Sequence, residues 1–149
     1  AYTHWLGLAL LFTTPPVLAQ TANFGTLTLN ATKTVGTLSG STGGSTSLPA
    51  ITSNTDRNNN KCLGFGDPTP DHILVLQQGV ENLTLQVTSG DPETTLVVQG
   101  PDGVRCSDNI ASRKPATIRD TDWSPGSYRI WVGTATPGVR RDYTLMIRQ

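Results

Sequence analysis

Short apolar runs separated by turn residues repeat along most of the chain. In the middle, the runs Ile73–Leu76, Leu83–Val87 and Leu96–Val98 are divided by turns rich in Gly, Pro and Asp. Apolar and polar positions alternate in several flanking runs, as they do in a strand with one buried face. The other runs that we expect to be strands are Phe24–Asn30, Val35–Leu38, Ser47–Ile51, Ala116–Arg119, Ser127–Gly133 and the alternating end of the chain at Tyr143, Leu145 and Ile147.

Regular short strands with such turns are typical of an antiparallel β-sandwich or jelly roll. After Ala19, no ten-residue window carries helical periodicity without Gly, Pro or β-branched interruption. We therefore predict an all-β fold of about eight strands in a single domain over residues 20–149. The stretches Asn54–Lys61 and Asp120–Gly126 are expected to be a polar loop and a tight turn.

The first 19 residues have a different character. Trp5–Phe12 is an apolar run, Pro15 and Pro16 interrupt it, and Val17 to Ala19 resemble a cleavage site. This order is typical of a secretory signal peptide, and the run is shorter than the roughly 18–20 residues that a membrane-spanning helix needs. We interpret residues 1–19 as a signal peptide, or else as a retained apolar segment. A secreted, cell-surface or periplasmic protein without a membrane span is expected.

The net charge limits the expected partners of the protein, and the cysteine content predicts a disulfide. The formal net charge of +0 gives no electrostatic reason to expect nucleic acid or an anionic membrane surface as a partner. In an exported protein, the two cysteines Cys62 and Cys106 are expected to form one disulfide. A structural disulfide is favoured over redox catalysis or zinc binding, because C-x-x-C spacing and further soft ligands are missing.

Six motifs follow one another in the second half of the chain. They are a D-H-x-L-x-L strand, an L-T-L-x-V strand, a T-T-L-V-V-x-G-P-D-G hairpin, C-x-D-N, W-x-P-G-x-Y-x-I-W-V-G and a closing Y-T-L strand. They occupy Asp71–Leu76, Leu83–Val87, Thr94–Gly103, Cys106–Asn109, Trp123–Gly133 and Tyr143–Leu145.

In this order the motifs resemble the bacterial pre-peptidase C-terminal (PPC) domain family, the small accessory β-sandwiches of secreted proteases. The Gly-Pro-Asp-Gly hairpin and the Pro-Gly-x-Tyr turn are the more specific parts, because few other residues adopt their backbone angles. The resemblance covers residues 68–148. It implies a module that binds and supports rather than catalyses, here a stand-alone exported member of the cyanobacterial type.

Residues able to catalyse are scarce. His72 is the single histidine after Ala19, and it stands beside Asp71 at the start of an apolar strand. A general base needs a nucleophile and an orienting group within reach, and no G-x-S-x-G motif occurs. A structural role for His72 is favoured, and we predict that the protein is not an enzyme. A small hydrolase using His72 and nearby carboxylates is the least favoured alternative.

One loop has the composition of a cation site. Asp56, Asn58 and Asn60 place three oxygen donors at alternate positions, a spacing that can wrap a loop around calcium. Lys61 and Asp67 stand where an EF-hand has its glycine and glutamate, so the loop is not an EF-hand. A disulfide between the two cysteines would bring Asp108 and Asn109 close. The predicted calcium ligands are Asp56, Asn58, Asn60, Asp108 and Asn109, with a metal-free Asn-rich loop as an equal alternative.

A binding surface is predicted on the Ser127–Gly133 strand. Trp131 and Arg129 alternate with its core-facing residues, so they point away from the core. An outward Trp beside an Arg is a candidate platform for a sugar or a peptide, unless a loop or the N-terminal segment covers it.

The sequence thus predicts a non-catalytic secreted module that binds an extracellular polysaccharide or partner protein, with calcium as the candidate cofactor. The alternative is a structural subunit of an extracellular filament or surface assembly. In that case the N-terminal segment would contact copies of the same chain.

Overall fold

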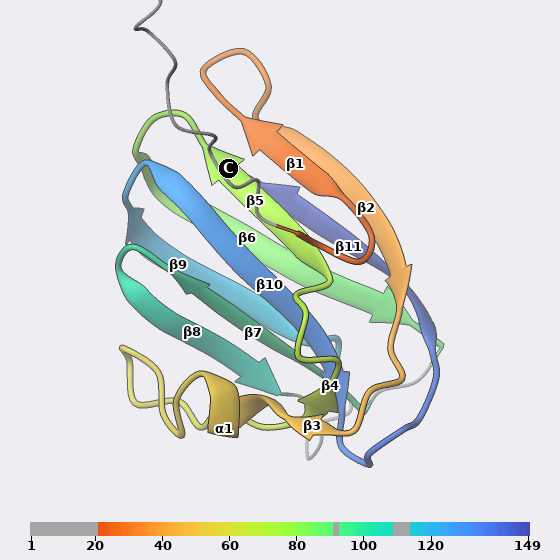
Figure 1. Cartoon of the computed structure of the whole chain (residues 1–149). Helices are drawn as coiled ribbons and strands as arrows, with labels where there is room; N and C mark the ends of the chain where they lie inside the picture. The colour runs from red at the N-terminus through yellow and green to blue at the C-terminus, as the bar shows by residue number, and fades with distance from the viewer. Residues whose placement is uncertain (1–20, 91–92, 109–113) are drawn as a thin grey trace, which may run out of the picture.

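Two β-sheets lie face to face in the computed structural model of this chain (Figure 1). The structure describes residues 21–90, 93–108 and 114–149. Within these ranges, eleven strands form one seven-stranded and one four-stranded sheet. The predicted all-β sandwich is confirmed, while the predicted signal peptide or N-terminal segment at residues 1–19 lies outside the described residues.

The two sheets take their strands from all parts of the described chain. The larger sheet contains β1 (Thr26–Leu29), β3 (Thr46–Ser47), β4 (Phe65–Gly66), β5 (His72–Leu76), β7 (Thr94–Gly100), β8 (Gly103–Asp108) and β10 (Gly126–Thr134). The smaller sheet contains β2 (Val35–Ser41), β6 (Val80–Ser89), β9 (Thr117–Trp123) and β11 (Asp142–Arg148), in the order β2-β11-β6-β9. In the larger sheet, β10 is central and pairs with β4, β5 and β7, while β1 and β8 are edge strands.

Edge strands of the two sheets meet on both sides of the sandwich. β1 lies near β2 on one side, and β8 lies near β9 on the other. Pairing is antiparallel throughout the described strands except between β1 and β5, which run parallel. The predicted antiparallel β-sandwich is confirmed, and β1–β5 is its one parallel pair among the described strands. The two parallel strands are joined by a connection of many residues, as a parallel pair requires.

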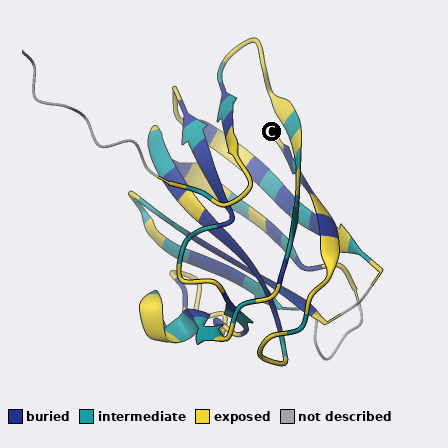
Figure 2. Cartoon of the chain, turned by 45° about the vertical axis from the view of Figure 1, so that its right-hand side comes forward, coloured by how far each residue is buried: buried dark blue, intermediate teal, exposed yellow. Residues whose placement is uncertain are grey.

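Alternation of side chains along the strands builds the core. Leu83, Leu85 and Val87 of β6 point inward, and Tyr143, Leu145 and Ile147 of β11 do the same. Figure 2 shows the result as alternating buried and exposed bands along the strands. Fully burying one such aliphatic side chain stabilises the fold by roughly 1.5–3 kcal/mol.

A second, smaller apolar cluster lies on the outer face of the larger sheet. It contains Leu48, Cys62, Val97, Cys106 and Trp131. Leu48 belongs to α1 (Leu48–Ile51), a single helical turn. The sequence predicted a strand over Ser47–Ile51 and no helix, and both expectations are wrong here. The Ser47 hydroxyl accepts a hydrogen bond from the Ala50 N–H (3.4 Å) and a proline follows in the first turn, so the chain begins a helix.

Two further differences concern strand boundaries. β8 follows the Gly-Pro-Asp-Gly turn and was not predicted, because its residues lack a clear apolar alternation. β9 continues to Trp123, through most of the segment predicted as a tight turn. Asp122 has a φ of 60°, so the strand bends there rather than reversing.

Candidate functional site

A polar cleft lies between the edge strands β8 and β9, beside the Asn54–Lys61 loop. Its volume is about 430 Å³. Carboxylate, amide, hydroxyl and basic side chains line most of it. The lining residues are Asp56, Asn58, Asn60, Lys61, Arg105, Cys106, Ser107, Asp108, Thr117, Ile118, Arg119 and Asp120.

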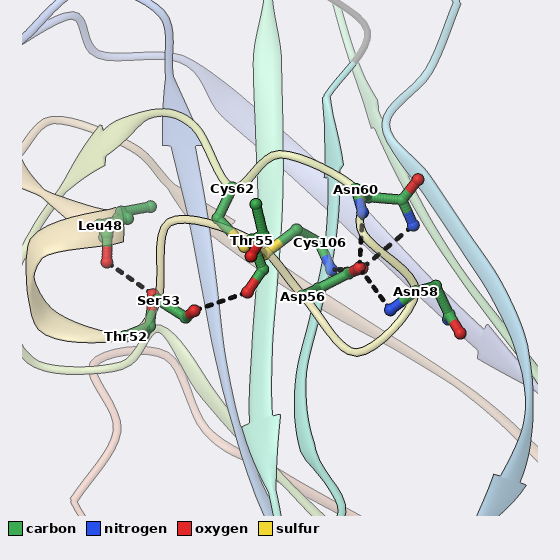
Figure 3. Close-up of a disulfide and its surroundings, with 9 residues drawn as sticks. All are labelled: Leu48, Thr52, Ser53, Thr55, Asp56, Asn58, Asn60, Cys62 and Cys106. Carbon is green, nitrogen blue, oxygen red and sulfur yellow. Dashed lines mark hydrogen bonds between the residues drawn. A yellow bond between two sulfur atoms is a disulfide. The ribbon is translucent and has the colours of Figure 1, made fainter.

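The disulfide joins the loop to strand β8, as Figure 3 shows. Cys62 and Cys106 are bonded, with their Cα atoms 5.2 Å apart, so the predicted disulfide is confirmed. Four of the five predicted calcium ligands, Asp56, Asn58, Asn60 and Asp108, line the same cleft. The fifth, Asn109, lies outside the described residues. The disulfide therefore brings the Asn54–Lys61 loop close to Asp108, as the sequence predicted.

The Asp56 carboxylate organises the loop (Figure 3). Its Oδ1 accepts hydrogen bonds from the backbone N–H groups of Asn58 and Asn60, each at 2.8 Å. Its Oδ2 accepts from the Asn60 side-chain amide at 3.1 Å and from the backbone N–H of Cys106 at 2.9 Å. Asp56 is 8% exposed. Four N–H donors thus surround one buried carboxylate, which closes the loop and caps the outer edge of β8.

This arrangement bears on the calcium prediction. A bound cation would have to displace N–H donors from Asp56, because both carboxylate oxygens already accept two hydrogen bonds each. Among the residues that the structure describes, no group of three or more His, Cys, Asp or Glu could hold a metal ion. Calcium stays a prediction, and the hydrogen bonds of Asp56 provide a metal-free reason for the loop's conformation.

Arg105 of β8 closes one wall of the cleft and links the two sheets. Its side chain is 1% exposed, and its Nε donates to Asp120 Oδ2 of β9 at 2.7 Å. Its Nη2 donates to the carbonyl oxygens of Thr121 (3.1 Å) and Asp122 (3.2 Å). The guanidinium carbon lies 3.7 Å from the centre of the Trp123 ring, which is cation–π geometry.

The bend at Asp122 makes this contact possible. In a regular strand, successive carbonyl groups point in opposite directions, so two neighbours cannot both accept from one side chain. The φ of 60° at Asp122 turns its carbonyl toward the side that Thr121 already faces. Burial alone would raise the pKa of Asp120, but the hydrogen bond and charge of Arg105, together with bonds from Thr121 and Asn58, hold it below its ordinary value.

The two turns that carry the motif residues meet beside Arg105. Asp102, in the Gly-Pro-Asp-Gly turn, accepts hydrogen bonds from the Ser124 N–H (2.9 Å), the Ser124 hydroxyl (2.6 Å) and the Tyr128 hydroxyl (3.1 Å). Its Oδ2 is also 3.9 Å from Arg105 Nη2. The Trp123 ring lies 5.4 Å from that of Tyr128. These contacts join the β7–β8 turn to the β9–β10 turn.

The platform predicted at Trp131 is not open. Trp131 does point away from the main core, as predicted, but it is 3% exposed and packs in the second cluster under the α1 segment. Its Nε1 donates to the Pro68 carbonyl at 3.2 Å. Arg129 is exposed beside it, 5.7 Å from the ring centre, and donates to Gln99 Oε1 at 2.6 Å. The covered alternative is therefore the correct one for the Trp131 ring.

His72 sits in the core rather than in a cleft. It is 0% exposed, and its Nε2 lies 2.7 Å from the Tyr143 hydroxyl. Burial lowers the pKa of His72 to about 4, an effect that the Gly25 carbonyl partly offsets. A neutral, enclosed imidazole cannot reach a substrate in solvent, so the structural role predicted for His72 fits the geometry.

The pKa of Asp71 is raised, whereas that of His72 is lowered. It is 4% exposed, and its Oδ2 accepts a hydrogen bond from the Val132 N–H at 2.7 Å. Burial raises the pKa of Asp71 to about 7; the Val132 hydrogen bond works against this rise, and the charge of Asp67 adds to it. Burial, with the charge of Asp71, also raises the pKa of Tyr143. These groups form a buried polar cluster that is separate from the cleft.

Sequence reasoning missed Arg105, the residue that connects most of the site. Its available signal was weak: a single arginine between Val104 and Cys106, two residues after the Gly-Pro-Asp-Gly turn. Whether such an arginine is buried depends on the acids and carbonyls of β9, which are distant in sequence.

Comparisons with known proteins give likenesses at the level of structure only. No protein family matches the sequence, and no curated protein matches it. The chain is similar to the solved structure of PliG from Aeromonas hydrophila, a periplasmic inhibitor of g-type lysozyme, with 15% identity, coverage of 83% of this chain and 97% of that chain, and a TM-score of 0.47. It is also similar to a mutant of PliG from Escherichia coli, again a periplasmic inhibitor of g-type lysozyme, with 9% identity, coverage of 83% and 96%, and a TM-score of 0.40. At these levels neither structure assigns a partner to this chain.

In residues 21–90, 93–108 and 114–149, no helix has the length and apolar character to cross a bilayer.

Arg105→Ala should destabilise the fold by about 3 kcal/mol, because it removes a buried ion pair and the cation–π contact. Urea unfolding monitored by circular dichroism measures this free energy. Arg119→Ala, an exposed arginine on β9, is the matched control and should change it by less than about 0.5 kcal/mol. Equal effects of the two substitutions would mean that Arg105 does not hold the sheets together.

Asp56→Asn should lower the free energy of unfolding by about 1–3 kcal/mol, because an amide replaces an acceptor that faces four N–H donors. Asp67→Asn is the control, since exposed Asp67 accepts one such bond, from Thr69 at 2.8 Å. The metal-free alternative predicts that about 1 mM calcium, or EDTA, leaves the melting temperature of the wild-type protein unchanged. A saturable rise with calcium that Asp56→Asn abolishes would establish the metal site instead.

Asp71 and His72 should make opposite contributions to the pH dependence of stability. Stability from neutral Asp71 is fully present below its ordinary pKa of 3.8 and is lost as pH rises through about 7. Stability from neutral His72 is fully present above pH 6.5 and is lost as pH falls through about 4. Between about pH 4 and pH 6.5, the loss of stability due to Asp71 and the gain due to His72 offset each other as the pH rises.

Single substitutions should separate the slopes. In Asp71→Asn, stability should rise as pH increases between about 4 and 6.5, and in His72→Gln it should fall as pH increases toward about 7, each by at most about 1.4 kcal/mol per pH unit. Urea unfolding across this range measures both. Parallel pH profiles for the wild type and the two variants would contradict this assignment.

Proposed function

We propose that this chain is a non-catalytic, exported binding module that recognises an extracellular polysaccharide or partner protein through the cleft between β8 and β9. The observation that supports this most is the combination of a polar cleft of about 430 Å³ with rigid walls. The Cys62–Cys106 disulfide holds the loop wall, and Arg105 with Asp120 holds the strand wall. A site whose shape is formed in advance loses less free energy in ordering when it binds.

The charges around the cleft favour a ligand without net charge. Three basic side chains (Lys61, Arg105 and Arg119) and three acidic ones (Asp56, Asp108 and Asp120) line it. The exposed amides of Asn58 and Asn60 and the half-buried hydroxyls of Ser107 and Thr117 stand among them. Sugar hydroxyls and peptide backbone groups match such a lining, since each can donate and accept hydrogen bonds.

The absence of catalysis is part of the proposal and is supported by His72. Its imidazole is enclosed in the core with a pKa lowered to about 4 by burial. A general base must be within reach of the proton that it removes. His72 therefore supports a structural role better than a catalytic one.

Export is supported by the disulfide, because such bonds persist in oxidising compartments. The resemblance to PPC domains leads to the same kind of module and stays a prediction. The alternative function, a structural subunit assembled through its N-terminal segment, depends on residues outside the described ranges and also stays a prediction.

Binding should be measured with defined probes. Insoluble peptidoglycan, chitin and cellulose serve as polysaccharides in a pull-down assay, and a g-type lysozyme serves as the protein probe. We expect saturable binding to at least one of them. Lys61→Glu and Asn58→Ala, both at exposed positions lining the cleft, should weaken it about tenfold, which is about 1.4 kcal/mol.

Lys33→Glu is the matched control, because Lys33 is exposed and does not line the cleft. It belongs to the β1–β2 turn, which lies away from β8 and β9 in Figure 1. Its binding should equal that of the wild type. Failure of all four probes to bind, or equal loss in Lys33→Glu and Lys61→Glu, would count against the proposed site.

A further inference from the structure

Strand β2 is an edge of the smaller sheet with one free side. It pairs along its whole length with β11, from Val35 opposite Arg148 to Ser41 opposite Asp142. No other strand among the described residues pairs with it. In Figure 1, β2 runs down the outside of the sandwich beyond β11.

The hydrogen bonds at the ends of β2 identify which backbone groups are free. The Gln149 N–H donates to the Thr34 carbonyl, and the Thr42 N–H donates to the Arg141 carbonyl, each at 2.9 Å. Since antiparallel pairing alternates, the even-numbered residues between them direct their N–H and C=O groups at β11. The odd-numbered residues therefore direct theirs outward. These are Val35, Thr37, Ser39 and Ser41.

The edges on the opposite side of the sandwich are covered. On β8, the Val104 carbonyl accepts from the Arg57 N–H at 3.0 Å, and the Cys106 N–H donates to Asp56. On β9, Arg105 takes the carbonyls of Thr121 and Asp122. For the outward groups of β2, no such cover exists in the described part of the chain.

β2 also lacks the usual devices that prevent strand pairing. Exposed edge strands are commonly protected by charged residues, proline, bulges or short length. β2 is seven residues long, its sequence is V-G-T-L-S-G-S, and it contains no charge and no proline. Its two glycines face inward: a Cβ at Gly36 would collide with Leu27, and one at Gly40 with Tyr143. The outer edge is thus open, regular and uncharged.

We propose that β2 pairs antiparallel with β2 of a second copy of this chain, forming a two-fold symmetric dimer with a continuous eight-stranded sheet. This surface is independent of the cleft and of its ligand. A register centred on Leu38 pairs all seven residues and places Thr37 opposite Ser39 of the second copy. In that register, the residues whose backbone N–H and C=O groups point outward lie opposite each other, as antiparallel pairing requires. Opposed Thr and Ser side chains on neighbouring strands stabilise a sheet.

The charges of β11 do not oppose a second copy as the partner of β2. On β11, Arg148 stands at one end and Asp142 at the other, opposite Val35 and Ser41. In the two-fold register, Val35 of one copy lies opposite Ser41 of the other. Each Arg148 then shares a row with Asp142 of the second copy, three strand spacings or about 14 Å away, so no like charges face each other across the junction. A symmetric contact of this kind closes at two subunits.

Sedimentation equilibrium of the full chain tests the proposal over protein concentrations from about 10 µM to about 1 mM, the range of weak interfaces. We expect a monomer–dimer equilibrium. Ser39→Pro removes an outward N–H without removing a bond to β11, and Ser39→Lys adds an edge charge. Both should raise the dimer dissociation constant at least about tenfold.

Thr88→Lys is the control for added charge, because Thr88 lies in the same row as Ser39 on the inner strand β6. It should dimerise like the wild type. Circular dichroism melting confirms that each variant is folded. A wild type that remains monomeric up to the highest concentration, or a dimer unaffected by Ser39→Pro and Ser39→Lys, would overturn the proposal.

Cysteine cross-linking tests the register. Under mild oxidation, a mixture of Thr37→Cys and Ser39→Cys proteins should form a disulfide-linked heterodimer, because these positions oppose each other at about 5.5 Å between Cα atoms. Each variant alone should cross-link less. Preferential cross-linking of either variant with itself would exclude the register centred on Leu38.

Discussion

The buried guanidinium of Arg105 is the interaction on which the β8–β9 side of this sandwich depends. Two sheets can pack face to face through apolar side chains alone, but their edges leave backbone groups without partners. Arg105 supplies donors to two carbonyls of β9 and an ion pair to Asp120. The same side chain therefore joins the sheets, covers an edge and forms a wall of the cleft.

Removing a charge from water is costly, so Arg105 must be compensated on several sides. Asp120 provides the main counter-charge, Asp102 lies at 3.9 Å, and the Trp123 ring covers one face. Nη1 is the exception: it is buried and has no hydrogen-bond partner among the described residues. The Asp122 bend, unusual for a residue other than glycine, is part of this compensation, because it presents a second carbonyl to Nη2.

The fold class could be predicted from the sequence because alternation of apolar and polar residues indicates a strand with one buried face. This prediction was most accurate where a strand is amphipathic, as at Tyr143, Leu145 and Ile147. The prediction of secondary structure failed where tertiary contacts determine the conformation. Leu48 of α1 is buried in the second cluster against the larger sheet, and β9 extends past Asp120 because Arg105 binds the following carbonyls. Neither contact has a local signature.

The candidate site was predictable in part for a similar reason. The even number of cysteines identified the disulfide, and the disulfide placed the Asp56 loop beside Asp108. Residue types alone could not show that Asp56 accepts four N–H groups, because that depends on loop geometry. Nor could alternation tell an outward Trp131 that is exposed from one that a neighbouring segment covers. The Gly-Pro-Asp-Gly and Trp-x-Pro-Gly-x-Tyr motifs predicted two turns. They did not predict that the Tyr128 hydroxyl of one motif donates a hydrogen bond to Asp102 of the other.

The pairing of β2 with β11 has a consequence for how the protein is made. β2 is the second of the described strands, and its one partner among them, β11, ends at Arg148. A ribosome delivers residues in order, so the smaller sheet cannot be completed before β11 (Asp142–Arg148) has emerged. The β1–β5 pair and the Cys62–Cys106 disulfide likewise wait for segments about 45 residues downstream. Such a chain therefore reaches its tertiary structure only after most of the described residues have been synthesised.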